Sequence, residues 1–271
     1  MNRIKNRFQQ LCEAGEKAFI PYITAGDPTL ERTAEIVQAL EKAGADIVEL
    51  GIPFSDPLAD GVVNQEAAMR ALRHGTTLHD VLGMVSDLRA HTQIPIVLFT
   101  YFNPVHSYGL AQFGPDCRAA GVDGVLCVDL PPEEAAEYKA SLDAHDIATI
   151  FLLAPTSTAE RTKTVSRQCT GFVYYVSRTG VTGERAAVEQ DVRSMVAKIK
   201  ECTDTPVAVG FGISKPEHAA EVAGYADGVI VGSAIVRLIG ELGDSPSTAA
   251  EVAAFVEPLI KAAKHGAVAG G

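Results

Sequence analysis

The chain has 271 residues, of which 47% are hydrophobic, and its formal net charge is −11 at pH 7. This length suits one domain with a large core, and the negative charge argues against nucleic-acid binding because no local basic stripe offsets it. Scattered cysteines without a C-x-x-C pair, and the lack of a signal sequence or membrane span, predict a soluble cytoplasmic protein without disulfides or a zinc knuckle.

Residues 1–8 are polar with helical periodicity and predict a short amphipathic helix. Eight short apolar runs follow, separated by longer segments of helical period. We predict a strand in each run: residues 18–23, 46–50, 95–99, 124–128, 148–152, 172–176, 206–209 and 228–231. Continuous rather than alternating hydrophobicity is typical of strands that are buried on both faces, as in a parallel sheet covered by helices.

These alternating elements favour one α/β domain over residues 1–271, folded as a single (β/α)8 TIM barrel of parallel strands with an extra N-terminal helix. An open doubly wound sheet is the alternative. It usually has fewer strands and a G-x-G-x-x-G turn after the first, whereas here residues 24–28 follow that strand. Residues 263–271 have the small-residue composition of a flexible tail.

A weak internal repeat supports one recurring structural unit. Gly44, Gly121 and Gly224 each stand where a predicted helix stops, and each leads through an aspartate directly into a strand. Residues 157–160 and 214–217 match capping boxes, with a serine three positions before a glutamate, and predict the starts of two helices.

Glu49 ends the very apolar second strand, where barrel enzymes place catalytic side chains, and burial of an unpaired carboxyl there would raise its pKa. From position alone, a strand-end glutamate bonded to an amide or an arginine is an equally good interpretation. The following loop, residues 51–61, is long and stiffened by two prolines, and it would let Asp60 fold back towards Glu49. Taken alone, Asp60 fits better as a cap of the next helix or a turn residue beside Gly61.

Glycine-bearing loops follow the last three predicted strands, at residues 177–183, 210–214 and 232–234. In barrels, such loops and the N-terminus of a short helix offer backbone N–H groups to a phosphate, and glycine allows the close approach. One such loop would be an ordinary turn, but three at corresponding positions predict a phosphate site.

The sequence lacks the motifs of several other common kinds of active site. The histidines show no metal-ligand spacing, and we predict no metal. The chain has no G-x-S-x-G elbow and no Walker lysine, and no predicted strand ends in the lysine that a Schiff-base aldolase needs. These patterns therefore argue against metal, nucleophile-elbow, P-loop and Schiff-base chemistry.

Residues 48–61, VELGIPFSDPLADG, resemble the signature of the tryptophan synthase alpha subunit family. Residues 21–28, 177–183 and 210–217 carry further similarity, so the resemblance spans nearly the whole chain. It implies a lyase of tryptophan biosynthesis that cleaves indole-3-glycerol phosphate by a retro-aldol reaction to indole and glyceraldehyde 3-phosphate.

The resemblance also implies roles for individual residues. Glu49 would be the general acid/base, with a raised pKa, and Asp60 would stay ionised and face the indole N–H. The residues implied to hold the phosphate are Gly183, Gly212, Gly232 and Ser233. Those implied to line the indole pocket and its lid are Tyr22, Phe99, Tyr174, Thr182 and Phe211. Tyr22 and Phe99 stand where family members often have phenylalanine and leucine, so they add a hydroxyl group and bulk.

The family's partner is a beta subunit that holds pyridoxal phosphate and receives the indole, in an alpha2-beta2 heterotetramer; the alpha chain itself would need no cofactor. The partner surface would lie on the active face of the barrel. The residues implied to contact the partner are Pro53, Asp56, Asn103, Pro104 and Asp129.

Two other functions are weighed against this one. The first is an idle barrel that binds a phosphorylated metabolite and activates its partner, against which the intact pair of Glu49 and Asp60 argues. The second is another phosphate-handling barrel, such as an indole-glycerol phosphate synthase or a sugar isomerase. The synthase would be expected to use a lysine at a strand end, which this sequence does not provide.

Overall fold

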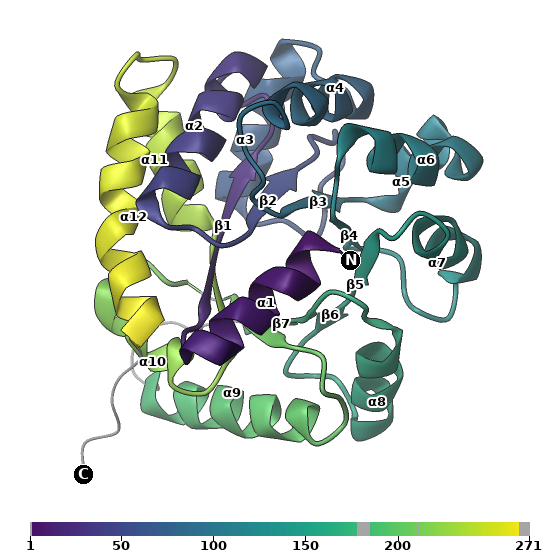
Figure 1. Cartoon of the computed structure of the whole chain (residues 1–271), viewed down its shortest axis with the longest axis vertical. Coiled ribbons are helices and arrows are strands. Elements are labelled where there is room, and N and C mark those ends of the chain that lie inside the picture. The colour runs from purple at the N-terminus through teal and green to yellow at the C-terminus, as the bar shows by residue number, and fades with distance from the viewer. Residues whose placement is uncertain (1, 178–184, 211, 266–271) are drawn as a thin grey trace.

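The computed structural model of the chain describes residues 2–177, 185–210 and 212–265 (Figure 1). Parallel strands form one sheet in the order β5-β4-β3-β2-β1-β9-β8-β7-β6. The strands of the described residues are β1 (Ala18–Thr24), β2 (Val48–Gly51), β3 (Ile96–Thr100), β4 (Gly124–Cys127), β5 (Ala148–Ile150), β6 (Leu152–Leu153), β7 (Val173–Val176), β8 (Val207–Gly210) and β9 (Gly228–Val231).

The two ends of this sheet meet at Phe151, the single residue between β5 and β6. β5 pairs with β4 and β6 pairs with β7, so residues 148–153 together occupy one strand position in a ring of eight. The backbone oxygen of Phe151 accepts a hydrogen bond from Tyr174 N–H at 3.2 Å, which continues the ring across the break. The predicted (β/α)8 barrel is confirmed, with its fifth strand divided in two.

Helices surround the ring of strands, and α1 lies across one end of it (Figure 1). The helices of the described residues are α1 (Arg3–Ala14), α2 (Leu30–Ala43), α3 (Val62–Arg73), α4 (Leu78–Leu88), α5 (Phe102–Tyr108), α6 (Leu110–Ala120), α7 (Ala136–Asp143), α8 (Ala159–Gln168), α9 (Arg185–Lys200), α10 (Pro216–Ala223), α11 (Ser233–Leu242) and α12 (Thr248–His265).

Side chains alternate along each strand between the barrel interior and the layer of helices. In β1, Ile20 packs in the interior cluster, whereas Phe19 packs in the outer cluster beneath the helices. Both faces of the strands are therefore buried, which explains the continuous apolar runs of the sequence. Ile4, Phe8 and Leu11 of α1 join the interior cluster, so the predicted N-terminal helix closes one end of the barrel.

The internal repeat places three buried or half-buried aspartates, Asp46, Asp123 and Asp227, just before β2, β4 and β9. Each carboxylate accepts a hydrogen bond from a backbone N–H at the start of the neighbouring strand. These donors are Phe19 for Asp46 at 2.7 Å, Ile96 for Asp123 at 2.9 Å and Val207 for Asp227 at 3.0 Å. The repeat therefore joins adjacent strands at the N-terminal end of the barrel.

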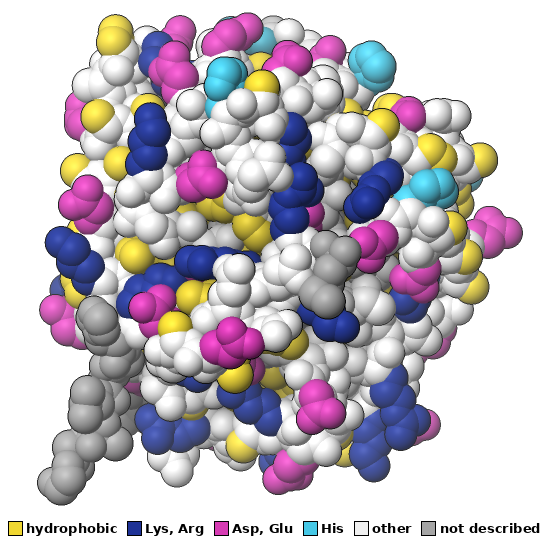
Figure 2. Space-filling view, viewed as in Figure 1, with side chains coloured by type: hydrophobic (Ala, Val, Ile, Leu, Met, Phe, Trp, Pro, Cys, Tyr) yellow, Lys and Arg dark blue, Asp and Glu magenta, His cyan; other side chains and the backbone are white. Residues whose placement is uncertain are grey.

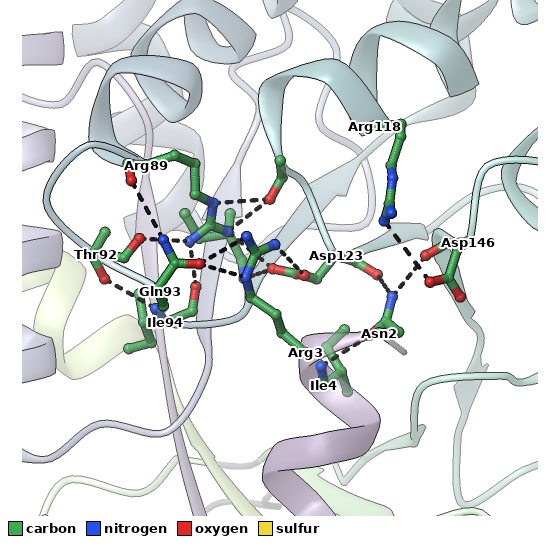
Figure 3. Close-up of polar contacts among 12 residues, drawn as sticks. Asn2, Arg3, Ile4, Arg89, Thr92, Gln93, Ile94, Arg118, Asp123 and Asp146 are labelled. Carbon is green, nitrogen blue, oxygen red and sulfur yellow. Dashed lines mark hydrogen bonds and ion pairs between the residues drawn. The ribbon is translucent and has the colours of Figure 1, made fainter.

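Two of these aspartates, Asp46 and Asp123, also hold α1 against this end of the barrel. Asp123 binds Arg3 of α1 at 3.0 Å and Arg89 at 2.9 Å (Figure 3). Asp46 binds Arg7, one turn further along α1, at 2.6 Å. These charges are satisfied by structural contacts, which agrees with a stabilising role for this end of a barrel.

Two helix starts differ from the prediction. Thr158 rather than Ser157 is the N-cap of α8, since its side chain accepts a hydrogen bond from Arg161 N–H at 3.2 Å. Lys215 is the N-cap of α10 and makes no side-chain capping bond, and Pro216 begins the helix. Both helices therefore begin within the predicted segments, but neither begins with the predicted capping box.

The predicted helix ends are confirmed more closely. Gly44 and Gly121 end α2 and α6 in the left-handed conformation that favours glycine. Gly224 ends α10 in a right-handed conformation. At the C-terminus, α12 continues through His265 and Ala263 is buried, so residues 263–265 are helical and not part of the predicted tail.

Among the described residues, no helix is long and apolar enough to cross a membrane. On the face that carries α1, lysine and arginine side chains are interspersed with aspartate and glutamate (Figure 2). This face therefore carries a mixed charge pattern.

Candidate active site

Glu49 points into the barrel from the second position of β2. Its neighbours Val48 and Leu50 pack in the outer cluster, and alternation along the strand turns Glu49 to the interior. The side chain is fully buried, and neither carboxyl oxygen has a hydrogen-bond partner in the part of the chain that the structure describes. Burial raises the pKa of Glu49 from 4.5 to about 8, as expected. This carboxyl group therefore holds a proton near neutral pH.

Asp60 lies at the end of the β2–α3 loop and is held by two side chains. Its Oδ2 accepts a hydrogen bond from the Tyr101 hydroxyl at 2.9 Å, and its Oδ1 accepts one from Asn64 Nδ2 at 3.5 Å. Gly61 is the N-cap of α3 and makes no side-chain capping bond, so the interpretation of Asp60 as the cap was wrong. Burial raises the pKa of Asp60, and the two hydrogen bonds oppose this shift.

Two tyrosines connect the carboxylates. Tyr22 pairs with Glu49 in the register of β1 and β2, and Tyr174 lies in β7 across the interior. Burial raises the pKa of both phenols, and the negative charges of Glu49 and Asp60 raise both further. Both phenols therefore stay protonated in the electrostatic field of the two carboxylates.

Aromatic rings form one wall of the site. The rings of Tyr22 and Phe99 meet edge to face with centroids 5.2 Å apart, and Phe99 and Tyr174 lie 6.5 Å apart. Such pairs prefer tilted arrangements, which hold each ring in place. The wall therefore presents flat apolar surfaces to the barrel interior.

Two strand-end glycines make room for the phenols. A Cβ atom on Gly51 would lie 2.1 Å from the Tyr22 hydroxyl, and one on Gly210 would lie 2.8 Å from the Tyr174 hydroxyl. Both distances are too short for real atoms, so any larger residue would displace a ring. Gly51 was not among the predicted site residues, although its position at the end of a strand could have indicated it.

A cavity of about 160 Å³ lies beside this wall. It is lined by Tyr22, Asn64, Phe99, Tyr174, Gly210, Gly212, Ile213, Ile230, Gly232 and Ser233. Gly232 is the N-cap of α11, and Ser233 is its first residue. The first N–H groups of a helix lack partners within the helix and point out of its N-terminus, where they favour an anion. Of the predicted residues, Gly183, Thr182 and Phe211 lie outside the described residues.

Two polar residues of the site were also not predicted. Tyr101 follows the end of β3, and Asn64 lies four positions after Asp60 on the first turn of α3. A polar residue directly after a strand, and the i,i+4 spacing to Asp60, were the signals that could have found them.

Comparison with known proteins decides the family. The family model for the tryptophan synthase alpha chain matches residues 8–264. The chain belongs to this family. The tryptophan synthase alpha chain of Geobacter sulfurreducens is 54% identical over 262 residues, which cover 97% of this chain and 99% of the relative. That of Solibacter usitatus is 49% identical over 259 residues, which cover 96% and 97%.

Solved structures of the family have the same fold. Tryptophan synthase subunit alpha from Legionella pneumophila superposes with a TM-score of 0.89 at 39% identity, over 97% of this chain and 98% of that one. A chain of the aminoacrylate-bound tryptophan synthase from Mycobacterium tuberculosis gives 0.87 at 34% identity, over 97% and 100%. The chain is therefore an enzyme subunit of tryptophan biosynthesis that cleaves indole-3-glycerol phosphate.

An alpha chain of tryptophan synthase implies a beta-subunit partner. Of the predicted contact residues, Asp56, Asn103 and Asp129 are exposed, whereas Pro53 is buried and Pro104 is half-buried in α5. Asp129 Oδ1 accepts a hydrogen bond from Phe102 N–H at 2.7 Å, which joins the segments after β3 and β4. The exposed residues thus lie at the C-terminal ends of the strands, on the same side as Asp60.

Proposed function

We propose that Glu49 is the general acid and base of the cleavage reaction and that Asp60 stabilises the charge that develops on the indole ring. The observation that carries this proposal is the burial of Glu49, whose two carboxyl oxygens have no partner among the described residues. A carboxyl group with a pKa of about 8 can both donate and accept a proton near neutral pH.

The reaction breaks the bond between indole C3 and the glycerol chain. Protonation of C3 by the Glu49 carboxyl group leaves a positive charge at the ring nitrogen, next to the ionised Asp60. The Glu49 carboxylate then accepts the proton of the hydroxyl on the adjacent carbon, and the bond electrons return to the ring. Indole and the aldehyde of glyceraldehyde 3-phosphate are released, and Glu49 is protonated again. Two carboxyl groups in different environments divide these roles.

We propose that the phosphate binds where α11 begins. Gly212, Gly232 and Ser233 line the cavity, and the positive end of the α11 dipole lies beside them. Gly183 belongs to the same proposed site, and Thr182 and Phe211 to the proposed indole pocket with Tyr22, Phe99 and Tyr174.

The assembly and its location are also proposals. We propose an alpha2-beta2 heterotetramer in the cytoplasm, in which the beta subunit holds pyridoxal phosphate and receives indole from this chain. The exposed Asp56, Asn103 and Asp129 at the C-terminal end of the barrel, and Pro53 and Pro104 beside them, support a contact on this side.

The roles are tested by indole formation from indole-3-glycerol phosphate, with the chain alone and with its beta subunit. We expect Glu49→Gln and Asp60→Asn to abolish indole formation while glyceraldehyde 3-phosphate still binds. Glu31→Gln and Asp87→Asn change exposed carboxylates and serve as matched controls with wild-type turnover. Wild-type turnover in Glu49→Gln would show that the acid and base lie elsewhere.

A further inference from the structure

Asn64 carries a buried hydrogen-bond acceptor that the proposed acid, base and phosphate site do not use. Its Oδ1 atom is shielded from solvent and has no hydrogen-bond partner among the described residues. The residue lines the same cavity as Gly212, Gly232 and Ser233. We propose that Asn64 is a positioning and specificity residue, whose Nδ2 holds Asp60 and whose Oδ1 accepts a hydrogen bond from a glycerol hydroxyl of the substrate.

The orientation of the Asn64 amide follows from its neighbour. The carboxylate of Asp60 can only accept hydrogen bonds, so the amide must turn its N–H2 group towards Asp60 Oδ1, which lies 3.5 Å from Nδ2. The opposite orientation would place two oxygens against each other. Oδ1 is thereby left facing away from Asp60, with no donor supplied by the described residues.

A buried acceptor without a donor is unfavourable, and proteins keep few of them. We therefore expect the ligand to supply the missing donor. The substrate offers three donors besides its phosphate: the indole N–H and two hydroxyls on the glycerol chain. Asp60, a charged acceptor, is the stronger partner for the indole N–H.

The remaining donors are the glycerol hydroxyls, and their place in the cavity agrees with this assignment. Asn64 shares the cavity with the aromatic wall of Tyr22 and Phe99 and with the proposed phosphate residues Gly232 and Ser233. In the substrate, only the glycerol chain lies between the indole and the phosphate. A site that bonds a hydroxyl rejects an analogue without it, because the acceptor then stays unpaired.

The inference rests on the proposed roles of Glu49 and Asp60, and it is tested by comparing two ligands. Indole-3-glycerol phosphate carries both hydroxyls, whereas 3-indolepropanol phosphate keeps the indole and the phosphate and lacks them. Dissociation constants are measured by titration calorimetry in the Glu49→Gln background, in which the substrate is not consumed. We expect Asn64→Leu to weaken binding of indole-3-glycerol phosphate roughly ten- to a hundredfold. The analogue should lose much less affinity.

Gln65→Leu is the matched control on the next position of α3. The Gln65 side chain donates to the backbone oxygen of Asp60 at 2.9 Å but does not line the cavity, so its loss should change both dissociation constants by the same factor. Ligand-free melting temperature checks folding. Asn64→Leu removes an unpaired buried acceptor but also the 3.5 Å hydrogen bond to Asp60, and because these two effects oppose each other we expect the melting temperature to change little. If the melting temperature of Asn64→Leu is clearly below that of the wild type, Asn64→Ala is used in its place.

Equal losses for the two ligands, or no loss for either, would overturn the role of Asn64. The catalytic proposal fails in a different way, through wild-type turnover in Glu49→Gln or Asp60→Asn. If Glu49→Gln turned the substrate over, dissociation constants could not be measured in that background. The effect of Asn64→Leu would then be compared through KM for indole-3-glycerol phosphate and the inhibition constant of 3-indolepropanol phosphate.

Discussion

The Tyr101 hydroxyl donates a hydrogen bond to Asp60 Oδ2 at 2.9 Å and accepts one from the backbone N–H of Ala59 at 3.0 Å. One phenol thus holds both the proposed charge-stabilising carboxylate and the loop that carries it. The ring itself is packed against Phe54, with centroids 5.2 Å apart.

Tyr101→Phe keeps this ring and removes only the hydroxyl. We expect kcat/KM to fall roughly tenfold or more, because a hydrogen bond to a charged group contributes about 1.5–3 kcal/mol. The Tyr101 bond lowers the pKa of Asp60, so its loss raises that pKa and moves the acid limb of the pH profile upward. Steady-state kinetics from pH 4 to 9 check both effects. If the acid limb of the pH profile did not change, it would not report the ionisation of Asp60.

The wild-type enzyme should lose activity as the pH rises through about 8. In the proposed mechanism Glu49 must be protonated in order to donate a proton to indole C3, and burial raises its pKa to about 8. The profile of kcat/KM reports groups of the free enzyme, so its basic limb should have this apparent pKa. A basic limb well above this value would argue against Glu49 as the acid.

Glu49→Gln should make the protein more stable than the wild type at high pH. The unfolded chain loses the Glu49 proton near pH 4.5, whereas the folded chain keeps it to about pH 8. Wild-type stability therefore falls as the pH rises between these values, by an amount on the order of a few kcal/mol, and the substitution removes this pH dependence. Urea unfolding at pH 5 and pH 8 measures the difference. A constant difference between the two pH values would contradict the raised pKa.

Gly51→Ala should disturb the aromatic wall. The new methyl group would lie 2.1 Å from the Tyr22 hydroxyl, so the ring or the strand must move. We expect a loss of about 1–3 kcal/mol in the free energy of unfolding, with reduced turnover. Tyr22→Phe in the same chain removes the closest atom and should recover part of this loss. If the double variant Gly51→Ala/Tyr22→Phe were no more stable than Gly51→Ala, the loss of stability would not come from contact with the Tyr22 hydroxyl.

Asp46→Asn should destabilise the barrel without changing the chemistry. The Asp46 carboxylate is buried and binds Arg7 and Lys264, each at 2.6 Å, at the end of the barrel closed by α1. Removal of one partner from a buried ion pair typically costs about 3–5 kcal/mol. Urea unfolding tests this, with kcat per folded enzyme unchanged. Asp143→Asn, which breaks an exposed pair with Lys139, is the control and should change stability by less than about 1 kcal/mol.

Much of the fold could be predicted from the sequence because its signals are local. Strands buried on both faces have continuous apolar runs, so all eight strand positions were visible. Gly44 and Gly121 mark helix ends because their backbone conformation is strained for other residues. The position of Glu49 on an apolar strand predicted its burial, but a carboxyl group bonded to an amide or an arginine fitted that position equally well, and only the structure shows both oxygens without a partner among the described residues.

The features that the sequence did not predict depend on contacts between residues far apart in the chain. Asp60 and Tyr101 are 41 positions apart, and no local pattern shows that the carboxylate meets this phenol instead of capping α3. The division of the fifth strand at Phe151 was visible only in the strand pairing, in which residues 148–150 pair with β4 and residues 152–153 pair with β7. The unpaired Oδ1 atom of Asn64 and its place in the cavity were visible only in the tertiary structure. Hydrophobic periodicity acts along the chain, whereas hydrogen-bond satisfaction and close packing depend on which elements the barrel brings together.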